Sequence, residues 1–301
     1  MNTPATPAPS VAVVVVSFNA RDALVACLDS LTRYAGVPFE AVVVDNASED
    51  GSAAAAAGRP ATRQVIANTV NVGFARACNQ GMRATTAPRV LFLNPDATVT
   101  GGAVEVLAAR LDAEPDVGVV GPLIRHPDDT VQVSTGPDLT LATERRQRRL
   151  VLGVRARDQG ALREAADRHG HEHEPDWVSG ACLMARREAL EAVGGFDEAF
   201  FLYEEDADLC RRLRAAGWRV VFTATAEVRH EIGRSMRRTP ERARLEYHRS
   251  HLLYYRKHNG PFAQCALRLL LLGRGLGGLA SGDRPRRAAA LALVRLALGR
   301  A

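Results

Sequence analysis

Paired cysteines are missing from this sequence of 301 residues. Its five cysteines are odd in number, widely spaced and without a Cys-x-x-Cys pair, which argues against a disulfide framework and a zinc knuckle. Such cysteines are typical of a reducing compartment. The opening MNTPATPAPS lacks the basic start and apolar core of a secretory signal. We therefore expect a disordered lead-in over residues 1–10 and a cytoplasmic protein.

Long apolar runs and glycine-rich phosphate loops are missing as well. No stretch reaches about 18 apolar residues, so no membrane-spanning helix is expected. The most apolar segment, 267–272, is interrupted by Arg268 and is expected to end at the glycines of 273–278. No Gly-x-Gly-x-x-Gly follows the first expected strand, and no Gly-x-x-x-x-Gly-Lys-Ser/Thr occurs anywhere. These absences disfavour a dehydrogenase-type dinucleotide fold and a P-loop NTPase.

The charge of the chain favours an anionic partner. The formal net charge is +5 and the pI is about 9.2, with arginine far outnumbering lysine. Nucleic acid, a phosphate-bearing substrate and an acidic membrane face all fit this balance, although a GC-rich genome also explains the excess of arginine. The RRQRR run at 145–149 is not interleaved with aromatic residues, and no nucleic-acid-binding motif is present. A nucleic-acid-binding protein is therefore the distant alternative.

The hydrophobic pattern of the first half predicts an α/β architecture. Buried-strand patterns alternate with helical ones, which predicts βαβ units and a mostly parallel, doubly wound sheet flanked by helices. The expected strands are 11–17, 40–44, 64–67, 89–93 and 117–120, and the expected helices are 19–32, 52–57, 73–84 and 101–113.

The second half is less regular. We expect a variable insert over 125–176 with one helix at 158–168, and we interpret its HGHEHE stretch as a solvated loop rather than a metal site. A C-terminal helical extension should follow the sheet. The remaining expected elements are strands 177–185 and 218–223 and helices 187–193, 205–216, 245–258, 262–272 and 286–298.

Three polar loops follow expected strands, at the edge where open parallel sheets bind ligands. They are Ser17-Phe18-Asn19, Asp45-Asn46-Ala47-Ser48 and Asn94-Pro95-Asp96. Asp45 could accept hydrogen bonds from a base or ribose. Asp96 offers one hard carboxylate to Mg²⁺ or Mn²⁺, which needs few protein ligands when phosphates and water fill the other positions. His230 could be a further ligand and would favour Mn²⁺.

The aromatic run FFLY is followed by four carboxylates in five positions, where a helix is expected to begin. Crowded like charges raise one another's pKa, which can produce a general base. Helical spacing places Glu205 and Asp208 on one side and directs Asp206 elsewhere. One acid would then face a substrate while Asp208 pairs with Arg211 or Arg212.

Taken together, these motifs resemble those of family 2 glycosyltransferases with the GT-A fold, and among them bacterial rhamnosyltransferases of cell-wall and polysaccharide assembly. The resemblance covers about residues 11–235 and ends near His230. Its motifs are VVVVSFNA (13–20), VVVDNASEDGS (42–52), NVGFARACNQG (71–81), LFLNPDA (91–97), GPLIR (121–125), WVSGACLMARR (177–187) and GGFDEAFFLYEEDADLCRRLRAAGW (194–218).

The resemblance implies roles for individual residues. Asp96 would be the acid of the metal-binding motif, whose first acid is replaced here by Asn94, and His230 would help to hold the metal or the diphosphate. Asp206 would be the catalytic base, with Glu205 as the alternative. Trp177, Ser179 and Gly180 would lie near the donor sugar and acceptor. The nucleotide sugar would be surrounded by Ser17, Phe18, Asn19, Asp45, Asn46, Asn71, Gly73, Phe74, Asn79, Asn94 and Asp96.

The implied reaction is a single displacement with inversion at the anomeric carbon. The expected donor is dTDP-rhamnose, with UDP-galactofuranose or UDP-N-acetylglucosamine as alternatives, and the acceptor is a hydroxyl of a glycan or a polyprenyl-linked molecule. Residues 11–238 would form the catalytic domain. Residues 239–301 would form basic amphipathic helices that lie on the cytoplasmic membrane face or pack on the catalytic domain. No pattern indicates an oligomeric state.

Overall fold

The valine-rich run of strand β1 (Val11–Ser17) lies inside a large sheet and is buried along its whole length. The structure is a computed structural model that describes residues 9–231, 240–281 and 283–299. Most of the expected lead-in and the expected domain boundary at 238/239 therefore lie outside the described residues. β-branched side chains on both faces of β1 suit a strand covered by helices on either side.

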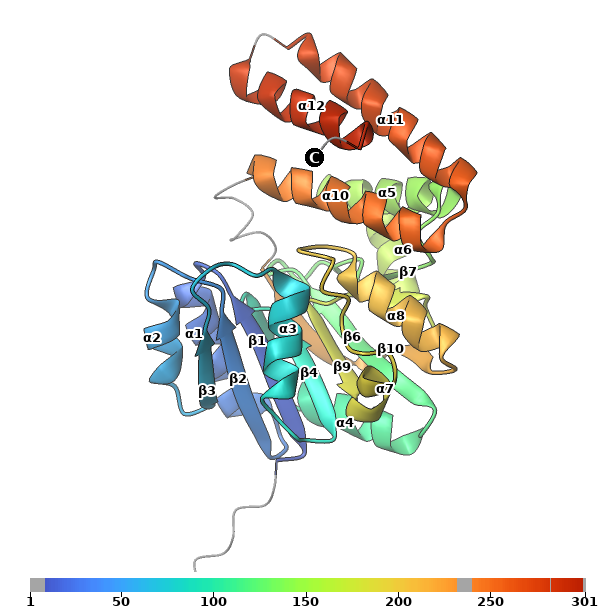
Figure 1. The fold of residues 1–301 in the computed structure, drawn as a ribbon. Helices are drawn as coiled ribbons and strands as arrows, with labels where there is room; N and C mark the ends of the chain where they lie inside the picture. Colours follow the sequence, from blue (N-terminus) through green and yellow to red (C-terminus); the bar gives the residue numbers. More distant parts are fainter. Residues whose placement is uncertain (1–8, 232–239, 282, 300–301) are drawn as a thin grey trace, which may run out of the picture.

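Eight strands form this sheet in the order β3-β2-β1-β4-β9-β6-β10-β5 (Figure 1). Strands β1 to β4 are mutually parallel, as are β6 and β10, whereas β9 and β5 run antiparallel to their neighbours. The mostly parallel sheet predicted from the sequence is thus confirmed. The remaining strands are β2 (Phe39–Asp45), β3 (Thr62–Ala67), β4 (Arg89–Leu93), β5 (Ala97–Val99), β6 (Val117–Arg125), β9 (Cys182–Arg186) and β10 (Arg219–His230).

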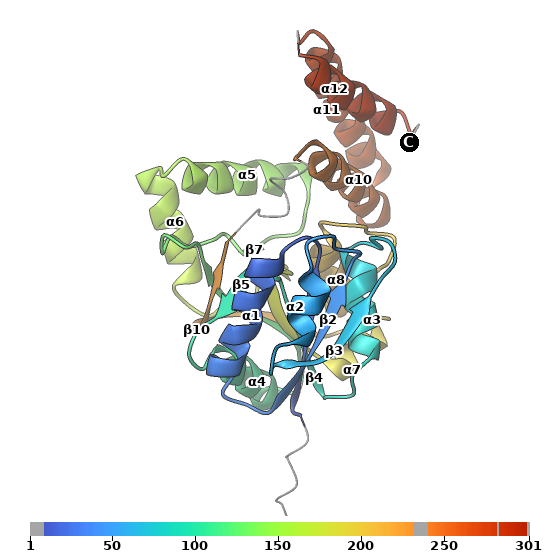
Figure 2. The same cartoon turned by 90° about the vertical axis from the view of Figure 1, so that its left-hand side faces the viewer.

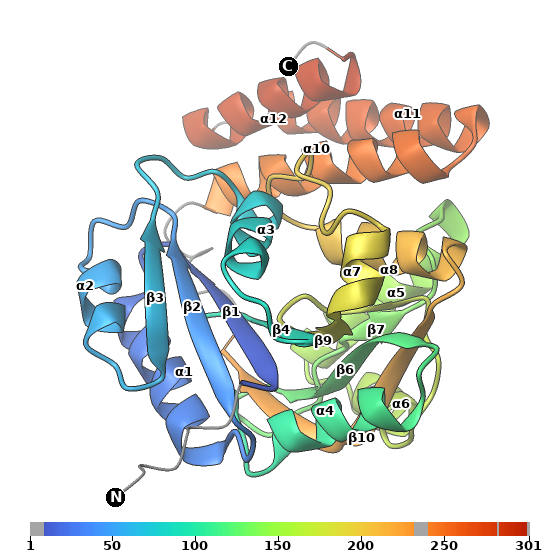
Figure 3. The ribbon, with the colours of Figure 1, turned by 60° about the horizontal axis from the view of Figure 1, so that its bottom comes forward.

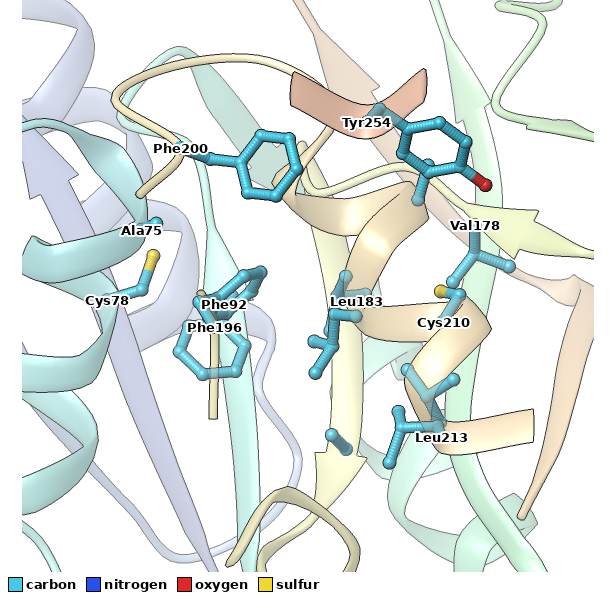
Figure 4. Packing of buried hydrophobic residues seen from close by; sticks show 14 of the residues in the cluster. Ala75, Cys78, Phe92, Val178, Leu183, Phe196, Phe200, Cys210, Leu213 and Tyr254 are labelled. Atoms are coloured by element: carbon cyan, nitrogen blue, oxygen red, sulfur yellow. The ribbon is translucent and has the colours of Figure 1, made fainter. Parts of the chain in front are cut away.

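Helices cover both faces of the sheet, as Figure 3 shows. One hydrophobic cluster joins the sheet to α1 (Arg21–Tyr34), α2 (Ser52–Ala57) and α4 (Ala103–Ala113). The opposite cluster joins it to α3 (Phe74–Arg83), α7 (Arg187–Ala192) and α8 (Glu205–Ala215). Phe92 and Phe196 meet edge to face in this second cluster, with ring centroids 4.9 Å apart (Figure 4). The predicted helices of the first half are confirmed to within a few residues.

One expected strand, 177–185, is wrong as a single element. It is divided into β8 (Trp177–Val178), which pairs with β7 (Thr135–Gly136), and β9 in the main sheet. Between them the Ser179 N–H donates to the Ser134 carbonyl at 2.8 Å, and the Cys182 N–H turns back to the Ser179 carbonyl at 3.3 Å. Strand β5 was not expected, because three residues carry too little periodicity to be recognised.

The insert contains two helices instead of one. The expected helix is confirmed as α6 (Gln159–His169), but α5 (Leu141–Arg155) precedes it and includes the arginine run. The solvated-loop interpretation of HGHEHE is wrong at His169, which is 1% exposed. Its ring packs edge to face on Phe222, and its Nδ1 and Nε2 lie within hydrogen-bond distance of the Ala165 carbonyl and the Ser134 N–H. These contacts satisfy a neutral ring, and burial lowers the pKa of His169 to about 4.

The C-terminal extension is helical, as predicted, and lies beyond the carboxyl edge of the sheet (Figures 1 and 2). It comprises α10 (Pro240–His258), α11 (Pro261–Leu279) and α12 (Arg284–Ala297). Tyr254 and Tyr255 of α10 are fully buried in the same cluster as the sheet residues, so α10 packs on the part of the chain that contains the sheet. Across the parts of the chain described above, no helix has both the length and the apolar character needed to span a membrane.

Helix α11 continues through the glycines that were expected to end it. A Cβ at Gly275 would lie 2.6 Å from Val294 Cγ2, and one at Gly278 would lie 2.8 Å from Ala290 Cβ. The glycines therefore allow α11 and α12 to approach closely, and this packing outweighs their poor helix propensity.

Candidate functional site

The ends of β1 and β2 present two buried polar atoms that have no partner. Ser17 and Asp45 are register neighbours at the carboxyl edge and are 0% and 3% exposed. Asp45 Oδ2 accepts from the Ser48 N–H at 2.9 Å, whereas Asp45 Oδ1 and Ser17 Oγ have no hydrogen-bond partner. Buried polar atoms without partners are costly. Two of them side by side mark a place where a polar ligand would supply the missing bonds.

The loops around this edge are tied to one another. The Asn19 N–H donates to Ser48 Oγ at 2.9 Å, and Asn19 Oδ1 accepts from the Glu49 N–H at 2.8 Å. Asn46 Nδ2 donates to the Gly73 carbonyl at 3.1 Å, which brings the loop before α3 to the same edge. Of the residues predicted around a nucleotide, Ser17, Asn19, Asp45, Asn46 and Gly73 are thereby gathered into one network.

Gly73 is held tightly between this network and the segment before α8. Its φ of 89° lies in the left-handed region, and a Cβ would lie 2.6 Å from the Phe201 carbonyl oxygen. Asn71 Oδ1 accepts from the Gly73 N–H at 3.0 Å, and the Phe74 N–H donates to the same Phe201 carbonyl at 2.7 Å. Only glycine fits this approach, since any side chain would collide with backbone.

Asn79 and Phe18, which were also predicted around the nucleotide, do not take part in this network. The Asn79 amide bonds to both the carbonyl and the N–H of Phe196, at 2.8 and 3.0 Å. Because its amide is already engaged, Asn79 ties α3 to the segment before α8, and we do not include it in the nucleotide site proposed below. Phe18, by contrast, is 39% exposed beside the gathered loops.

Asp96 and His230, 134 positions apart, meet across the sheet edge. Their Oδ1 and Nε2 atoms lie 3.1 Å apart, and the other ring nitrogen of His230 lies 2.9 Å from Gln132 Oε1. Strand β5 causes this meeting, because its first residue, Ala97, is the register partner of His230 in β10. Asn94 lies close by, with its Nδ2 3.4 Å from His230 Nε2.

The turn between β8 and β9 joins this pair to the acids of α8. The Asn94 N–H donates to the Ala181 carbonyl at 2.9 Å, and the Gly180 N–H donates to Asp206 Oδ2 at 2.7 Å. Two adjacent residues of one turn thus contact the Asp96 loop on one side and the Asp206 carboxylate on the other. Ser179 lies in the same turn, while Trp177 directs its Nε1–H to the Pro137 carbonyl at 2.9 Å.

The crowded acids of α8 have separate environments. Asp208 bonds to Arg212 at 2.7 Å, which confirms one of the two predicted pairings, and also to His258 at 2.7 Å and Lys257 at 2.5 Å. Burial acts to raise its pKa, but the hydrogen bonds from His258 and Lys257 and the Arg212 guanidinium lower the pKa of Asp208 to about 2. This acid is therefore a structural anion that joins α8 to the end of α10.

Glu205 and Asp206 both have raised pKa values. Glu205 is 5% exposed, and burial followed by the charge of Asp206 raises its pKa well above the ordinary value. Burial raises the pKa of Cys78 in α3, and the charge of Glu205 adds to this rise. Asp206 is only partly buried and bonds to two backbone N–H groups, those of Gly180 and Ala207. Burial raises the pKa of Asp206, and these N–H groups oppose the shift.

The turn before α8 is strained and is held by α10. Tyr203 and Glu204 both adopt left-handed φ values, 72° and 63°, which cost about 1–3 kcal/mol each for residues other than glycine. Glu204 Oε1 lies 2.6 Å from His251 Nδ1, and the other nitrogen of this ring lies 3.1 Å from Glu144 of α5. Ser250 Oγ donates to the Leu202 carbonyl at 2.7 Å. Helix α10 thus fixes the backbone just ahead of Asp206.

Sequence reasoning missed Gln132, Glu144 and His251. Gln132 and Glu144 lie in the segment interpreted as an irregular insert, and His251 lies in a helix expected only to be amphipathic. No spacing links these residues to the site motifs, because their partners are brought to them by tertiary packing alone. Their contacts with His230 and Glu204 are visible only in the structure.

Comparisons with known proteins agree with this geometry. The family model of glycosyl transferase family 2 matches residues 12–194. An N-acetylglucosaminyl-diphospho-decaprenol L-rhamnosyltransferase from Mycobacterium tuberculosis is 32% identical over 274 residues, which cover 87% of this chain and 89% of that protein.

Solved glycosyltransferase structures share the fold. A mannosyltransferase from Pyrobaculum calidifontis in complex with GDP-Man and Mn²⁺ matches 97% of this chain and 81% of its own, with a TM-score of 0.58 and 21% identity. S. aureus TarS 1–349 in complex with UDP-GlcNAc also covers 97% of this chain and 81% of its own, with a TM-score of 0.57 and 16% identity. The chain therefore belongs to glycosyl transferase family 2 and is a glycosyltransferase with the GT-A fold.

Proposed function

We propose that this protein is an inverting transferase that moves L-rhamnose from dTDP-rhamnose to a hydroxyl of a polyprenyl-linked glycan acceptor, in cell-wall or polysaccharide assembly. The observation that carries the proposal is the turn at Gly180 and Ala181, whose backbone contacts both the Asp96 loop and Asp206. A donor diphosphate beside Asp96 and an acceptor hydroxyl beside Asp206 would then meet at this turn.

The donor nucleotide fits the edge of β1 and β2. Ser17 Oγ and Asp45 Oδ1 are buried without partners and can bond to the N–H or O–H groups of a base or ribose. In our proposal Phe18, Asn19, Asn46, Asn71, Gly73 and Phe74 complete this part of the site.

The residues at Asp96 fit a divalent cation that is shared with the donor. Within the described parts of the chain, no three histidine, cysteine, aspartate or glutamate side chains gather into a metal site of their own. Asp96 and His230 offer one carboxylate and one imidazole, and Gln132 orients the imidazole through its second nitrogen. Mn²⁺ or Mg²⁺ bound there would stabilise the charge of the leaving diphosphate.

Asp206 is the proposed base. Because its pKa is raised, the Asp206 carboxylate binds a proton more readily than an ordinary aspartate, as a general base at neutral pH requires. The Gly180 N–H holds this carboxylate in place. As the acceptor oxygen forms its bond to the anomeric carbon, the hydroxyl proton passes to Asp206, and the bond to the diphosphate breaks. Ser179, Gly180 and Trp177 line the sugar and acceptor side in this proposal.

The choice of donor and acceptor follows the relative from M. tuberculosis, whose name gives rhamnose as the sugar and a diphospho-decaprenol acceptor. UDP-galactofuranose and UDP-N-acetylglucosamine are the alternative donors. We place the protein in the cytoplasm, in peripheral contact with the membrane. Exposed apolar side chains on α11 and α12 support this contact, among them Phe262, Leu269, Leu276 and Leu291.

The test is sugar transfer to a prenyl-diphosphate-linked N-acetylglucosamine, measured with each candidate donor, in Mn²⁺ and in EDTA. We expect turnover with dTDP-rhamnose and its loss in EDTA. Turnover only with a UDP sugar would replace rhamnose by that sugar. Turnover that is unaffected by chelation would refute the metal assignment.

A further inference from the structure

Three arginines from three different helices lie within electrostatic reach of His248, in the middle of α10. Arg148 of α5, Arg244 of α10 and Arg274 of α11 all act electrostatically on His248 of α10. Arg244 and His248 are four residues apart and therefore lie on the same face of their helix. Arg148 and Arg274 also act on the neighbouring Tyr247. We call Arg148, Arg244, Arg274 and His248 the cationic cluster.

The cluster has no anion of its own. Among the described residues, none of the three guanidinium groups has a hydrogen bond or a carboxylate within ion-pair distance, and all three side chains are exposed. Many other arginines of the chain are paired, for example Arg212 with Asp208. Converging guanidinium groups repel one another, so their free energy falls when an anion binds between them.

The ring of His248 is affected by the positive charge of this cluster. Its Nδ1 is buried without a hydrogen-bond partner. Burial, followed by the positive charges of His251, Arg274, Arg244 and Arg148, lowers the pKa of His248 to about 4. The ring is therefore neutral at physiological pH, and its free nitrogen can bond to a ligand oxygen or hydroxyl.

The cluster adjoins the proposed acceptor side of the site. Tyr247 stacks on His251, with ring centroids 5.5 Å apart, and meets Tyr203 edge to face at 6.0 Å. Tyr203 begins the strained turn that leads through Glu204 to Asp206. The two nearby carboxylates, Glu204 and Glu144, lie within ion-pair distance of His251. In the described parts of the chain, neither of them lies within ion-pair distance of the three arginines.

The donor diphosphate of the proposed function is assigned elsewhere, at Asp96 and His230. A second anion site, near the turn that precedes Asp206, therefore fits the other substrate. Helix α10 lies beyond the carboxyl edge of the sheet, and α11 and α12, which carry exposed apolar residues, lie farther from the sheet (Figures 1 and 2). In an acceptor whose phosphates are attached to a prenyl chain, the phosphates could lie at α10 while the apolar tail lies against α11 and α12.

We propose that the cationic cluster binds the phosphate or diphosphate group of a prenyl-linked acceptor and thereby selects this acceptor class. The inference rests on the proposed function only for the identity of the acceptor. The same phosphate chemistry occurs in the headgroups of anionic phospholipids, so the experiment separates the two sources.

The experiment compares two triple variants of the full chain that remove the same charge. The first is Arg148→Gln, Arg244→Gln and Arg274→Gln in the cluster. The second, the control, is Arg145→Gln, Arg242→Gln and Arg287→Gln, at exposed arginines that likewise have no ion pair within the described ranges. The probes are farnesyl diphosphate, uncharged farnesol, and vesicles that contain phosphatidylglycerol. Binding of dTDP with Mn²⁺ reports an intact donor site.

We expect the cluster variant to bind farnesyl diphosphate more weakly by on the order of a hundredfold, because three charge-assisted contacts are lost. The control variant should bind it within about threefold of wild type, and dTDP binding should be unchanged in both. Equal losses in the two variants would overturn the proposal, as would equal affinity of the wild type for farnesol and farnesyl diphosphate. A loss confined to vesicle binding would assign the cluster to lipid headgroups instead and would also overturn it.

These binding measurements do not depend on turnover. Absence of sugar transfer with every donor would contradict the proposed function, while the anion site would still be tested by farnesyl diphosphate binding. Conversely, active transfer with an unaffected KM for the prenyl-diphosphate-linked acceptor in the cluster variant would contradict the anion site alone.

Discussion

At the scale of single residues, the neighbouring acids of α8 differ in pKa because each has different surroundings. Asp208 has three cationic or hydrogen-bonding partners and a pKa of about 2, whereas burial raises the pKa of both Glu205 and Asp206. Only Asp206 lies against the turn that also contacts the Asp96 loop. Glu205 is 5% exposed, and its Oε2 is buried without a hydrogen-bond partner.

Substitutions of Asp206 and Glu205 distinguish the roles of these two acids. We expect Asp206→Asn to lower kcat for transfer by about 10²–10⁴-fold while retaining donor binding, because the amide keeps the bond from the Gly180 N–H but cannot accept a proton. Glu205→Gln is the matched control. Burial raises the pKa of Glu205 well above its ordinary value, and glutamine keeps the shape of this side chain while removing its capacity to accept a proton.

Steady-state transfer rates and donor affinities of the two variants check this prediction. Transfer by Asp206→Asn within a few-fold of wild type would exclude Asp206 as the base. A large loss in Glu205→Gln alone would assign the role to Glu205.

At the scale of elements, close helix packing explains why a glycine-rich segment remains helical. Gly275→Ala and Gly278→Ala place a methyl group against α12 and should destabilise the protein by about 1–3 kcal/mol each, the usual cost of overpacking. Gly273 and Gly277 lie in the same helix with no neighbouring atom within 4 Å of an added Cβ. Alanine at these two positions should stabilise the protein by about 0.5–1 kcal/mol through helix propensity.

Urea unfolding followed by helical circular dichroism gives the four free energies of unfolding. Opposite signs for the two pairs are the expected outcome. The same sign for all four variants would mean that α11 and α12 do not pack in solution as they do in the structure.

At the scale of the whole molecule, His251 connects the insert, the turn before α8 and the C-terminal extension. It lies between Glu204 and Glu144, and it is 4% exposed. Burial opposes its charged form, but the charge of Glu204 and the bonds to Glu144 and Glu204 raise the pKa of His251 to about 10. A group whose pKa is raised on folding stabilises the folded state most below its ordinary pKa, and this contribution is lost as the pH rises through the folded value.

His251→Gln should therefore destabilise the protein most near pH 6.5, and the difference from wild type should shrink as the pH approaches 10. The measurement is the free energy of unfolding of both proteins between pH 6.5 and 10. His171→Gln, at an exposed histidine, serves as the control and should differ little from wild type at any pH. A His251→Gln effect that does not change over this range would show that the side chain is not charged in the folded protein.

The amino-acid pattern was sufficient for the parts of this protein that depend on local order. Valine-rich strands, helical spacing and polar residues after strands are short-range features, so the sheet class, most elements and the loops of Ser17, Asp45 and Asp96 could be predicted. Helical spacing also separated Asp206 from Glu205 and Asp208. Family motifs then supplied the reaction.

Tertiary structure decided which distant residues meet. Asp96 reaches His230 because three residues of β5 pair with the end of β10, and Asp206 reaches the Asp96 loop through a turn that interrupts an expected strand. The contact of His251 with Glu204 and the convergence of three arginines on His248 depend on how α5, α10 and α11 pack beyond the sheet. Such contacts join positions up to 136 residues apart. No local periodicity encodes them, because they follow from the burial of side chains between elements that are fixed only when the whole chain folds.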